Sequence, residues 1–172
     1  EAEEAKYWDV RHESFNLLRK HVQGKHTAPF IDDFVVRPEY LPEFLPKVDA
    51  ILKTYDLTYT IAGHPGDGNF HIIPLMDLKD LKTRPIILEL SDKIYDLVLQ
   101  YHGSITAEHN DGIIRSPYLE KQYGSIVTDL FKQVKELFDP HYIFNPHKKV
   151  GVTKDDIAKY LSKGDYGEAT KK

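Results

Sequence analysis

Two histidines flank a turn in the segment GHPGDGNFH, residues 63–71. If Asp67 and Gly68 form the centre of a two-residue turn, His64 lies directly opposite His71 on the neighbouring strand, with Cβ atoms ~4.5–5.5 Å apart. Two imidazoles at that distance can bind one metal ion, but a register shift of one residue would put them on opposite faces of the sheet. The alternative is a turn between ordinary, half-buried strand histidines, and the two histidines alone favour this alternative.

A carboxylate that could complete such a site lies in ITAEHNDG, residues 105–112, where Glu108 is followed by His109. Two histidines and one carboxylate leave open coordination positions on Zn²⁺, Fe²⁺ or Mn²⁺, where a substrate hydroxyl can bind. A free histidine beside the ion, with an unperturbed pKa of ~6.5, can accept the hydroxyl proton. An exposed loop of ordinary polar residues is the alternative for this segment.

The elements that must position these residues follow from apolar periodicity. Helices are predicted at 1–23, 41–56, 85–101, 117–138 and 153–164, the last with Thr153 as its N-cap. Strands are predicted at 28–38, at 57–64 and 69–76, and in a short stretch from 104 that runs into a loop, while 142–151 is predicted to be extended. This order indicates an α+β fold, in which helices pack on one face of an antiparallel sheet (a ferredoxin-like cap) and a C-terminal helical segment follows.

The composition narrows the function classes. The 172 residues include nine histidines and no cysteine, and the net charge is −4. Without cysteine, disulfides, thiolate zinc sites and thiol nucleophiles are excluded, so a metal would be held by His, Asp, Glu or backbone oxygen. The mild, dispersed charge argues against nucleic-acid binding, and no apolar run reaches the ~18 residues of a membrane span. Because the sequence starts without Met or signal-peptide features, we expect an excised piece of a longer polypeptide.

Three motifs occur in a fixed order: GHPGDGNFH, then GSITAEHNDG, then FDPHYIFNPHKK. Together they resemble the C-terminal region of the FAD-linked oxidases of the vanillyl-alcohol-oxidase type, which include the D-lactate and D-2-hydroxyglutarate dehydrogenases and the glycolate oxidase flavin subunit. YWDVRHES and IDDFVVRPEYLPEF, further upstream, also resemble this family. The resemblance covers roughly residues 7–151.

The resemblance implies a role for several individual residues. In metal-dependent members, the matching histidines and glutamate bind a divalent ion, and the next histidine acts as the base. An arginine binds the substrate carboxylate, and an asparagine lies near the flavin ring. The matching residues here are His64, His71 and Glu108 for the metal, His109 for the base, Arg11 for the substrate and Asn145 for the flavin.

Four further positions qualify this assignment. Asn110 and His147 stand where the family pattern has glycine. Asn tolerates a positive φ, whereas a side chain at 147 would hinder close approach of the backbone to a flavin. Arg115 is a candidate second cation for a larger diacid substrate, or else a surface charge at a helix start. Asp33 is a candidate for orienting part of the site, although an acidic residue of an edge strand is the simpler interpretation.

The resemblance also implies a division of the chain. Residues 1–105 would form the cap and substrate part, 106–151 the segment that closes over the flavin, and 152–172 a polar tail. FAD would be bound mainly by an N-terminal FAD-binding domain that this chain lacks, so we expect the isolated chain to be inactive. The expected partners are a small 2-hydroxy acid and that domain, with an electron-acceptor subunit and a second copy of the chain as further candidates.

The expected location is the cytoplasm, or the periphery of the inner membrane for the full-length protein. Two other functions remain open at this point: a non-enzymatic metal-binding module that uses the same side chains, and an oligomerisation module in which the histidines are structural.

Overall fold

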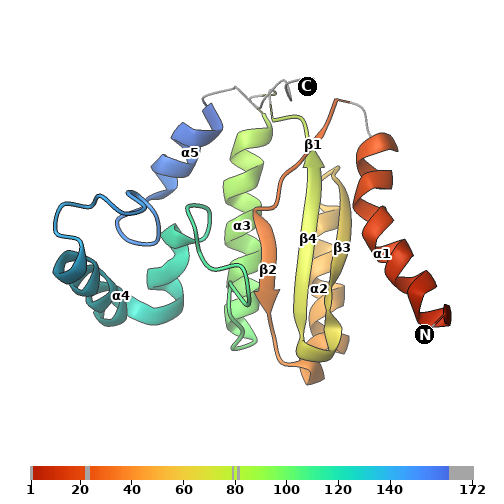
Figure 1. Cartoon of the computed structure of the whole chain (residues 1–172), viewed down its shortest axis with the longest axis horizontal. Coiled ribbons are helices and arrows are strands. Elements are labelled where there is room, and N and C mark those ends of the chain that lie inside the picture. The colour runs from red at the N-terminus through yellow and green to blue at the C-terminus, as the bar shows by residue number, and fades with distance from the viewer. Residues whose placement is uncertain (1, 22–23, 79, 81, 163–172) are drawn as a thin grey trace.

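The computed structural model describes residues 2–21, 24–78, 80 and 82–162 (Figure 1). Within these residues the elements follow in the order α1 (Ala2–His21), β1 (His26–Thr27), β2 (Ile31–Val35), α2 (Leu41–Lys53), β3 (Thr58–His64), β4 (Asn69–Met76), α3 (Thr83–Gln100), α4 (Leu119–Phe138) and α5 (Lys154–Ser162). Single turns of 3₁₀ helix precede α2, β4 and α4, at Pro38–Tyr40, Pro65–Asp67 and Ser116–Tyr118. None of the described helices is long and apolar enough to span a membrane.

Strand β4 is the centre of an antiparallel sheet. It pairs along one edge with β3, from Thr58 opposite Leu75 to His64 opposite Asn69. Along its other edge it pairs with β1 at one end and with β2 at the other. Because the backbone of a strand is pleated, successive side chains of β4 point to opposite faces of the sheet.

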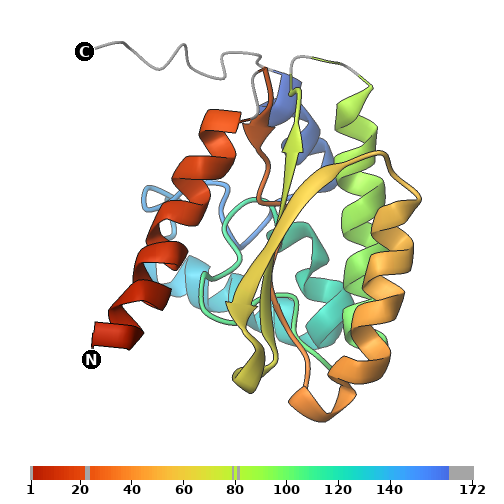
Figure 2. The same cartoon turned by 90° about the vertical axis from the view of Figure 1, so that its right-hand side faces the viewer.

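One face of the sheet carries the core, under α2 and α3 (Figure 2). Phe70, Ile72 and Met76 of β4 are buried in this core. Phe34 of β2 packs against Phe44 of α2 and against Phe70, with ring centroids 5.7 and 6.1 Å apart. The intervening residues of β4, including His71, therefore point to the opposite face. The predicted α+β fold with an antiparallel sheet is confirmed, with α2 and α3 on the core face.

The N-terminal helix lies apart from this core. Figure 2 shows α1 on the side of the sheet opposite to α2 and α3, and its side chains are exposed from Glu3 to Glu13. The last helix, α5, begins with a capping box. The Thr153 hydroxyl accepts from the Asp156 amide, while the Asp156 carboxylate accepts from the Thr153 amide and hydroxyl. The predicted N-cap is confirmed.

Two predicted extended segments are wrong. The strand expected from 104 is reduced to one bridge between Ser104 and Val35, because the backbone amides that follow donate to side chains: that of Ile105 to Gln122, and those of residues 107–109 to the carboxylate of Asp33. Residues 142–151 form turns, because the Asp139 carboxylate accepts hydrogen bonds from the amides of Ile143 and Phe144. Helix α4 also departs from the predicted continuous helix, with a kink at Gly124 (φ 76°, ψ 165°).

The hairpin loop between β3 and β4 offers a test of this backbone arrangement. Gly68 has φ 73°, and a Cβ there would meet the carbonyl oxygen of Val36. We expect Gly68→Ala to lower the free energy of unfolding by about 2 kcal/mol or more, since a left-handed conformation and a backbone clash act together. Gly66→Ala is the matched control, because a Cβ at Gly66 meets nothing within 4 Å. Urea unfolding measures both, and equal effects would contradict the loop geometry.

Candidate metal centre

The hairpin that carries His64 and His71 is wider than predicted. Its loop spans residues 65–68, with a 3₁₀ turn closed by the Gly68 amide on the Pro65 carbonyl. His64 is therefore paired with Asn69, and Ala62 with His71. The predicted two-residue turn is wrong. The observed pairing differs from the predicted one by two residues, and because side chains alternate with a period of two, His64 and His71 still lie on the same face of the sheet. The two imidazoles are diagonal neighbours, with ring centroids 5.9 Å apart.

Glu108 meets this histidine pair from a distant part of the chain. Its Oε1 atom lies 3.0 Å from Nε2 of His71 and 3.5 Å from Nε2 of His64. Nε2 of His109 lies 3.6 Å from the same oxygen. The structure thus brings together the four residues that the sequence nominated for a metal ion and a base, with three imidazole nitrogens facing one carboxylate oxygen.

The orientation of His71 is set by Asp32, which lies opposite it on β2. Nδ1 of His71 is 2.8 Å from Oδ1 of Asp32, and both side chains are largely buried. A carboxylate at Nδ1 favours the tautomer with its proton on Nδ1, which leaves the Nε2 lone pair directed at Glu108. Carboxylate–histidine pairs of this kind commonly support metal ligands.

The spacing of these atoms fits an ion. For metal–nitrogen bonds of ~2.0–2.1 Å in a tetrahedral site, neighbouring ligand atoms are ~3.4 Å apart. The separations from Glu108 Oε1 to the three imidazole nitrogens, 3.0, 3.5 and 3.6 Å, lie on both sides of that value. Ligand atoms of His71, Glu108 and His109 lie within 4.8 Å of one another and could hold a divalent metal, and His64 adds an imidazole nitrogen 3.5 Å from Glu108.

Asp33, the sequence's candidate for orienting part of the site, has a backbone conformation that the sequence did not predict. It occupies a bulge in β2, where the register shifts between Asp32 and Phe34, and it has φ 71°. Its side chain is fully buried. Burial alone would raise the pKa of Asp33, but hydrogen bonds from the amides of residues 107–109 and from the Thr106 hydroxyl lower it below its ordinary value. Asp33 is thus held as a buried anion.

Arg115 is buried next to the same loop. Nε and Nη2 donate to the carbonyl oxygen of Asn110, and Nη1 donates to that of Asp32. Its guanidinium also lies 4.0 Å from Asp33. The expectation of a surface charge at a helix start is wrong. The geometry also differs from that of a substrate cation, because the donors of Arg115 already bind backbone carbonyls on both sides of the site.

The two remaining predicted residues are more peripheral. Arg11 is an exposed residue of α1, and Asn145 is exposed in the turns after α4 with φ 46°. Their assignments to substrate and flavin stay predictions. The segment that holds Asn145 is tied to the centre by Lys149, whose Nζ lies 2.9 Å from Asp111 and whose amide donates to the carbonyl of Gly112.

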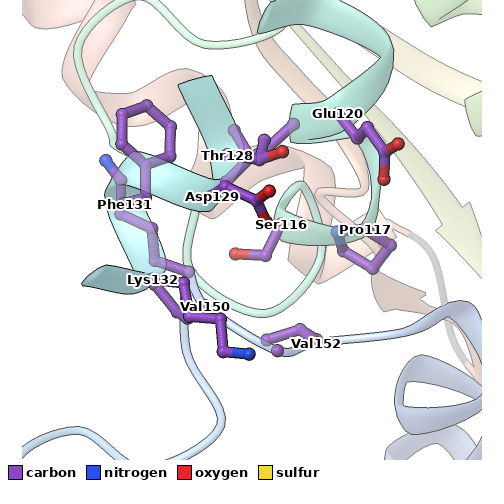
Figure 3. A pocket seen from close by; sticks show the side chains of 12 residues that line it. Ser116, Pro117, Glu120, Thr128, Asp129, Phe131, Lys132, Val150 and Val152 are labelled. Carbon is purple, nitrogen blue, oxygen red and sulfur yellow. The ribbon is translucent and has the colours of Figure 1, made fainter. Parts of the chain in front are cut away.

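A cavity of about 220 Å³ lies elsewhere on the protein, beside α4 and residues 149–152 (Figure 3). Lys132 and Lys149 line it together with Glu120 and Asp129, so charges of both signs are mixed there. None of the site residues predicted from the sequence lines this cavity. The chemistry-bearing side chains therefore gather at the histidine cluster.

The sequence of the chain matches a known protein family. A model of the C-terminal domain of FAD-linked oxidases matches residues 1–149, and the chain belongs to this family. The D-2-hydroxyglutarate dehydrogenases of Pseudomonas putida and Escherichia coli are 33% and 30% identical to it, over 82% and 81% of this chain but 14% of each relative. The probable mitochondrial D-lactate dehydrogenase of Danio rerio is 26% identical, over 87% of this chain and 30% of that protein.

The chain therefore spans only 14–30% of the length of these relatives. What the family establishes for this chain is a domain that belongs to a larger FAD-linked protein.

The buried position of Arg115 generates a stability prediction. We expect Arg115→Lys to lower the free energy of unfolding by about 2–4 kcal/mol, because one ammonium group cannot reach the carbonyls of Asn110 and Asp32 together. Arg37→Lys is the control, since the Arg37 side chain is 71% exposed, and its effect should stay within about 0.5 kcal/mol. Urea unfolding compares the two variants. An Arg115→Lys protein as stable as the unsubstituted chain would contradict a clamping role.

Proposed function

We propose that this chain is the metal- and substrate-binding part of a flavin-dependent oxidoreductase that converts a D-2-hydroxy acid to a 2-oxo acid. The observation that carries the proposal is the position of Glu108 Oε1 within 3.0–3.6 Å of three imidazole nitrogens. Membership in the FAD-linked oxidase family and the similarity to a D-2-hydroxyglutarate dehydrogenase and a probable D-lactate dehydrogenase support it.

His64, His71 and Glu108 are the proposed ligands of a Zn²⁺, Fe²⁺ or Mn²⁺ ion. Their imidazole and carboxylate donors suit these metals, and three protein ligands leave coordination positions open. When bound, the ion would polarise the substrate hydroxyl and lower its pKa. His71, fixed by Asp32, would set the orientation of the site.

His109 is the proposed base. Its Nε2 lies on the same side of Glu108 as the other imidazoles, and its side chain is about half exposed, so a substrate can reach it. Oxidation of the substrate removes a hydroxyl proton and a Cα hydride, and FAD supplies the hydride acceptor. In this proposal His109 Nε2 takes the proton, and Arg11 holds the substrate carboxylate through its guanidinium.

The proposed partner is the FAD-binding domain of the full-length protein. Several large apolar side chains of α4 and the following turns are exposed in this chain: Tyr123, Ile126, Leu130, Val134, Leu137, Phe138, Ile143 and Phe144. An apolar surface of this kind marks an interaction site. It runs into the segment of Asn145, which we propose to lie beside the flavin.

The first test is metal binding by the chain itself. After treatment with EDTA, we expect the chain to bind one Mn²⁺ or Zn²⁺ ion, measured by isothermal titration calorimetry. His71→Ala and Glu108→Gln should each weaken the affinity at least about 100-fold, because each removes a ligand. His26→Ala, an exposed histidine of β1, is the control and should bind as the unsubstituted chain does. If the unsubstituted chain binds no ion, the histidines have a structural role and the proposal is wrong.

The second test is turnover by the full-length protein that joins this chain to an FAD-binding domain. We expect dye reduction with a D-2-hydroxy acid, its loss after EDTA, and no turnover by the isolated chain. His109→Gln should lower kcat by about 10²–10⁴-fold while the ion is retained, as expected for a general base. Loss of the ion in His109→Gln would make His109 a ligand instead. Metal binding without any turnover would favour a non-enzymatic metal-binding module.

A further inference from the structure

Two consecutive carboxylates of β2 point to different elements of the centre. Asp32 is in register with His71 and accepts from its imidazole. Asp33 follows in the bulge, and its left-handed backbone turns the carboxylate away from the strand direction. One bulge therefore contacts both the strand that carries His71 and the loop that carries Glu108.

The contacts of Asp33 are concentrated on that loop. Its carboxylate accepts from the amides of Ala107, Glu108 and His109, at 3.0, 3.0 and 2.8 Å, and from the Thr106 hydroxyl at 2.9 Å. Three successive amides aimed at one anion form the concave arrangement known as a nest. Asn69 adds a hydrogen bond from its side-chain amide at 3.3 Å.

These contacts decide whether Asp33 can be a metal ligand. It lies close enough to His71, Glu108 and His109 to be counted among potential ligands. Its two oxygens, however, already accept hydrogen bonds from the loop amides and from two side chains, and the group is fully buried. An oxygen whose lone pairs are taken by protein donors is not available to an ion.

The other hydrogen bonds of the loop lie at its two ends, where the Ser104 hydroxyl donates to the Thr106 carbonyl and Arg115 donates to the Asn110 carbonyl. The side chains of Glu108 and His109 are about half exposed, and residues 106–109 belong to no helix or strand. Without the nest, three amides would lose their acceptor, and the loop would have to be ordered whenever an ion bound. Ordering a mobile ligand weakens apparent affinity, since its entropy cost falls on the binding step.

We propose that Asp33 is a positioning residue of the metal centre: it holds the loop of residues 106–109 so that Glu108 is already in place when the ion arrives. This inference rests on the proposed metal site, and it goes further by assigning the placement of Glu108 to a buried carboxylate that is not itself a ligand.

The test is a double-mutant cycle of Mn²⁺ affinity, measured by calorimetry on the chain. Asp33→Asn replaces one acceptor oxygen by an NH₂ group. This group only donates hydrogen bonds, so the loop amides that point at it lose their acceptor. We expect this variant to bind Mn²⁺ about 10–100-fold more weakly. In its background Glu108→Gln should cost much less than in the unsubstituted chain, because Glu108 is already displaced.

Asp139→Asn is the matched control. Asp139 is likewise buried and likewise accepts from two successive loop amides, but its loop carries none of the proposed ligands. It should lower stability and leave Mn²⁺ affinity unchanged. Thr106→Val removes one donor to Asp33 with little change of shape, and should weaken Mn²⁺ binding by about 3–10-fold even if Asp33→Asn does not fold.

The outcomes separate the two proposals. If the unsubstituted chain binds no Mn²⁺, both the proposed metal site and this inference fall. If it binds, but folded Asp33→Asn binds equally well, or the effects of Asp33→Asn and Glu108→Gln simply add, the positioning role alone is overturned. If Asp33→Asn does not fold, wild-type affinity in Thr106→Val overturns it.

Discussion

Backbone amides that leave a sheet must find another acceptor, and in this protein three successive amides find it in the buried carboxylate of Asp33. Ser104 still pairs with Val35 across the sheet. The amides of Ile105 and Thr106 then donate to the side chains of Gln122 and Ser104, and those of residues 107–109 donate to Asp33. A buried amide without an acceptor would cost about 1–3 kcal/mol of folding free energy. The hydrogen bonds to Asp33 therefore stabilise this path of the chain after it leaves the sheet. The position of Glu108, and with it the meeting of four polar side chains, depends on that exchange.

The layered fold explains why those side chains have room to meet. Helices α2 and α3 bury one face of the sheet, where Phe70, Ile72 and Met76 of β4 lie in the core. The other face carries His64, His71 and Asp32, and α1, whose side chains are exposed from Glu3 to Glu13, lies beyond it. The face of the sheet under α2 and α3 thus carries the hydrophobic core, and the opposite face carries the polar cluster.

Much of the fold could be predicted from the sequence, because alternation and helical spacing are local properties. The bounds of β4 agree with prediction at 69–76, and those of β3 differ by one residue. The same-face relation of His64 and His71 also followed from local spacing. The length of the turn could not be predicted from local spacing. An Asp-Gly pair is typical of a two-residue turn, whereas here the Gly68 amide and the Pro65 carbonyl close a 3₁₀ turn.

The bulge could not be predicted for a different reason. IDDFVV fits a regular strand, and nothing in its pattern shows that Asp33 will take φ 71°. The turns after α4 likewise depend on Asp139 capturing two amides. In both places a carboxylate competes with the sheet for backbone donors, and the winner depends on tertiary contacts that local spacing does not encode. Arg115 was misjudged similarly, because burial of a cation depends on carbonyls contributed from residues 32 and 110.

The width of the histidine hairpin has a consequence for how this region can vary among related chains. The side chains of each strand alternate with a period of two. Whether the two imidazoles lie on the same face of the sheet therefore depends on whether the number of residues between them changes by an even or an odd number. Loops longer or shorter by two residues keep both rings on one side, whereas a single insertion or deletion turns one of them into the core. Length changes in this hairpin should therefore accumulate in even steps, and an odd change should survive only beside a second one that restores the count.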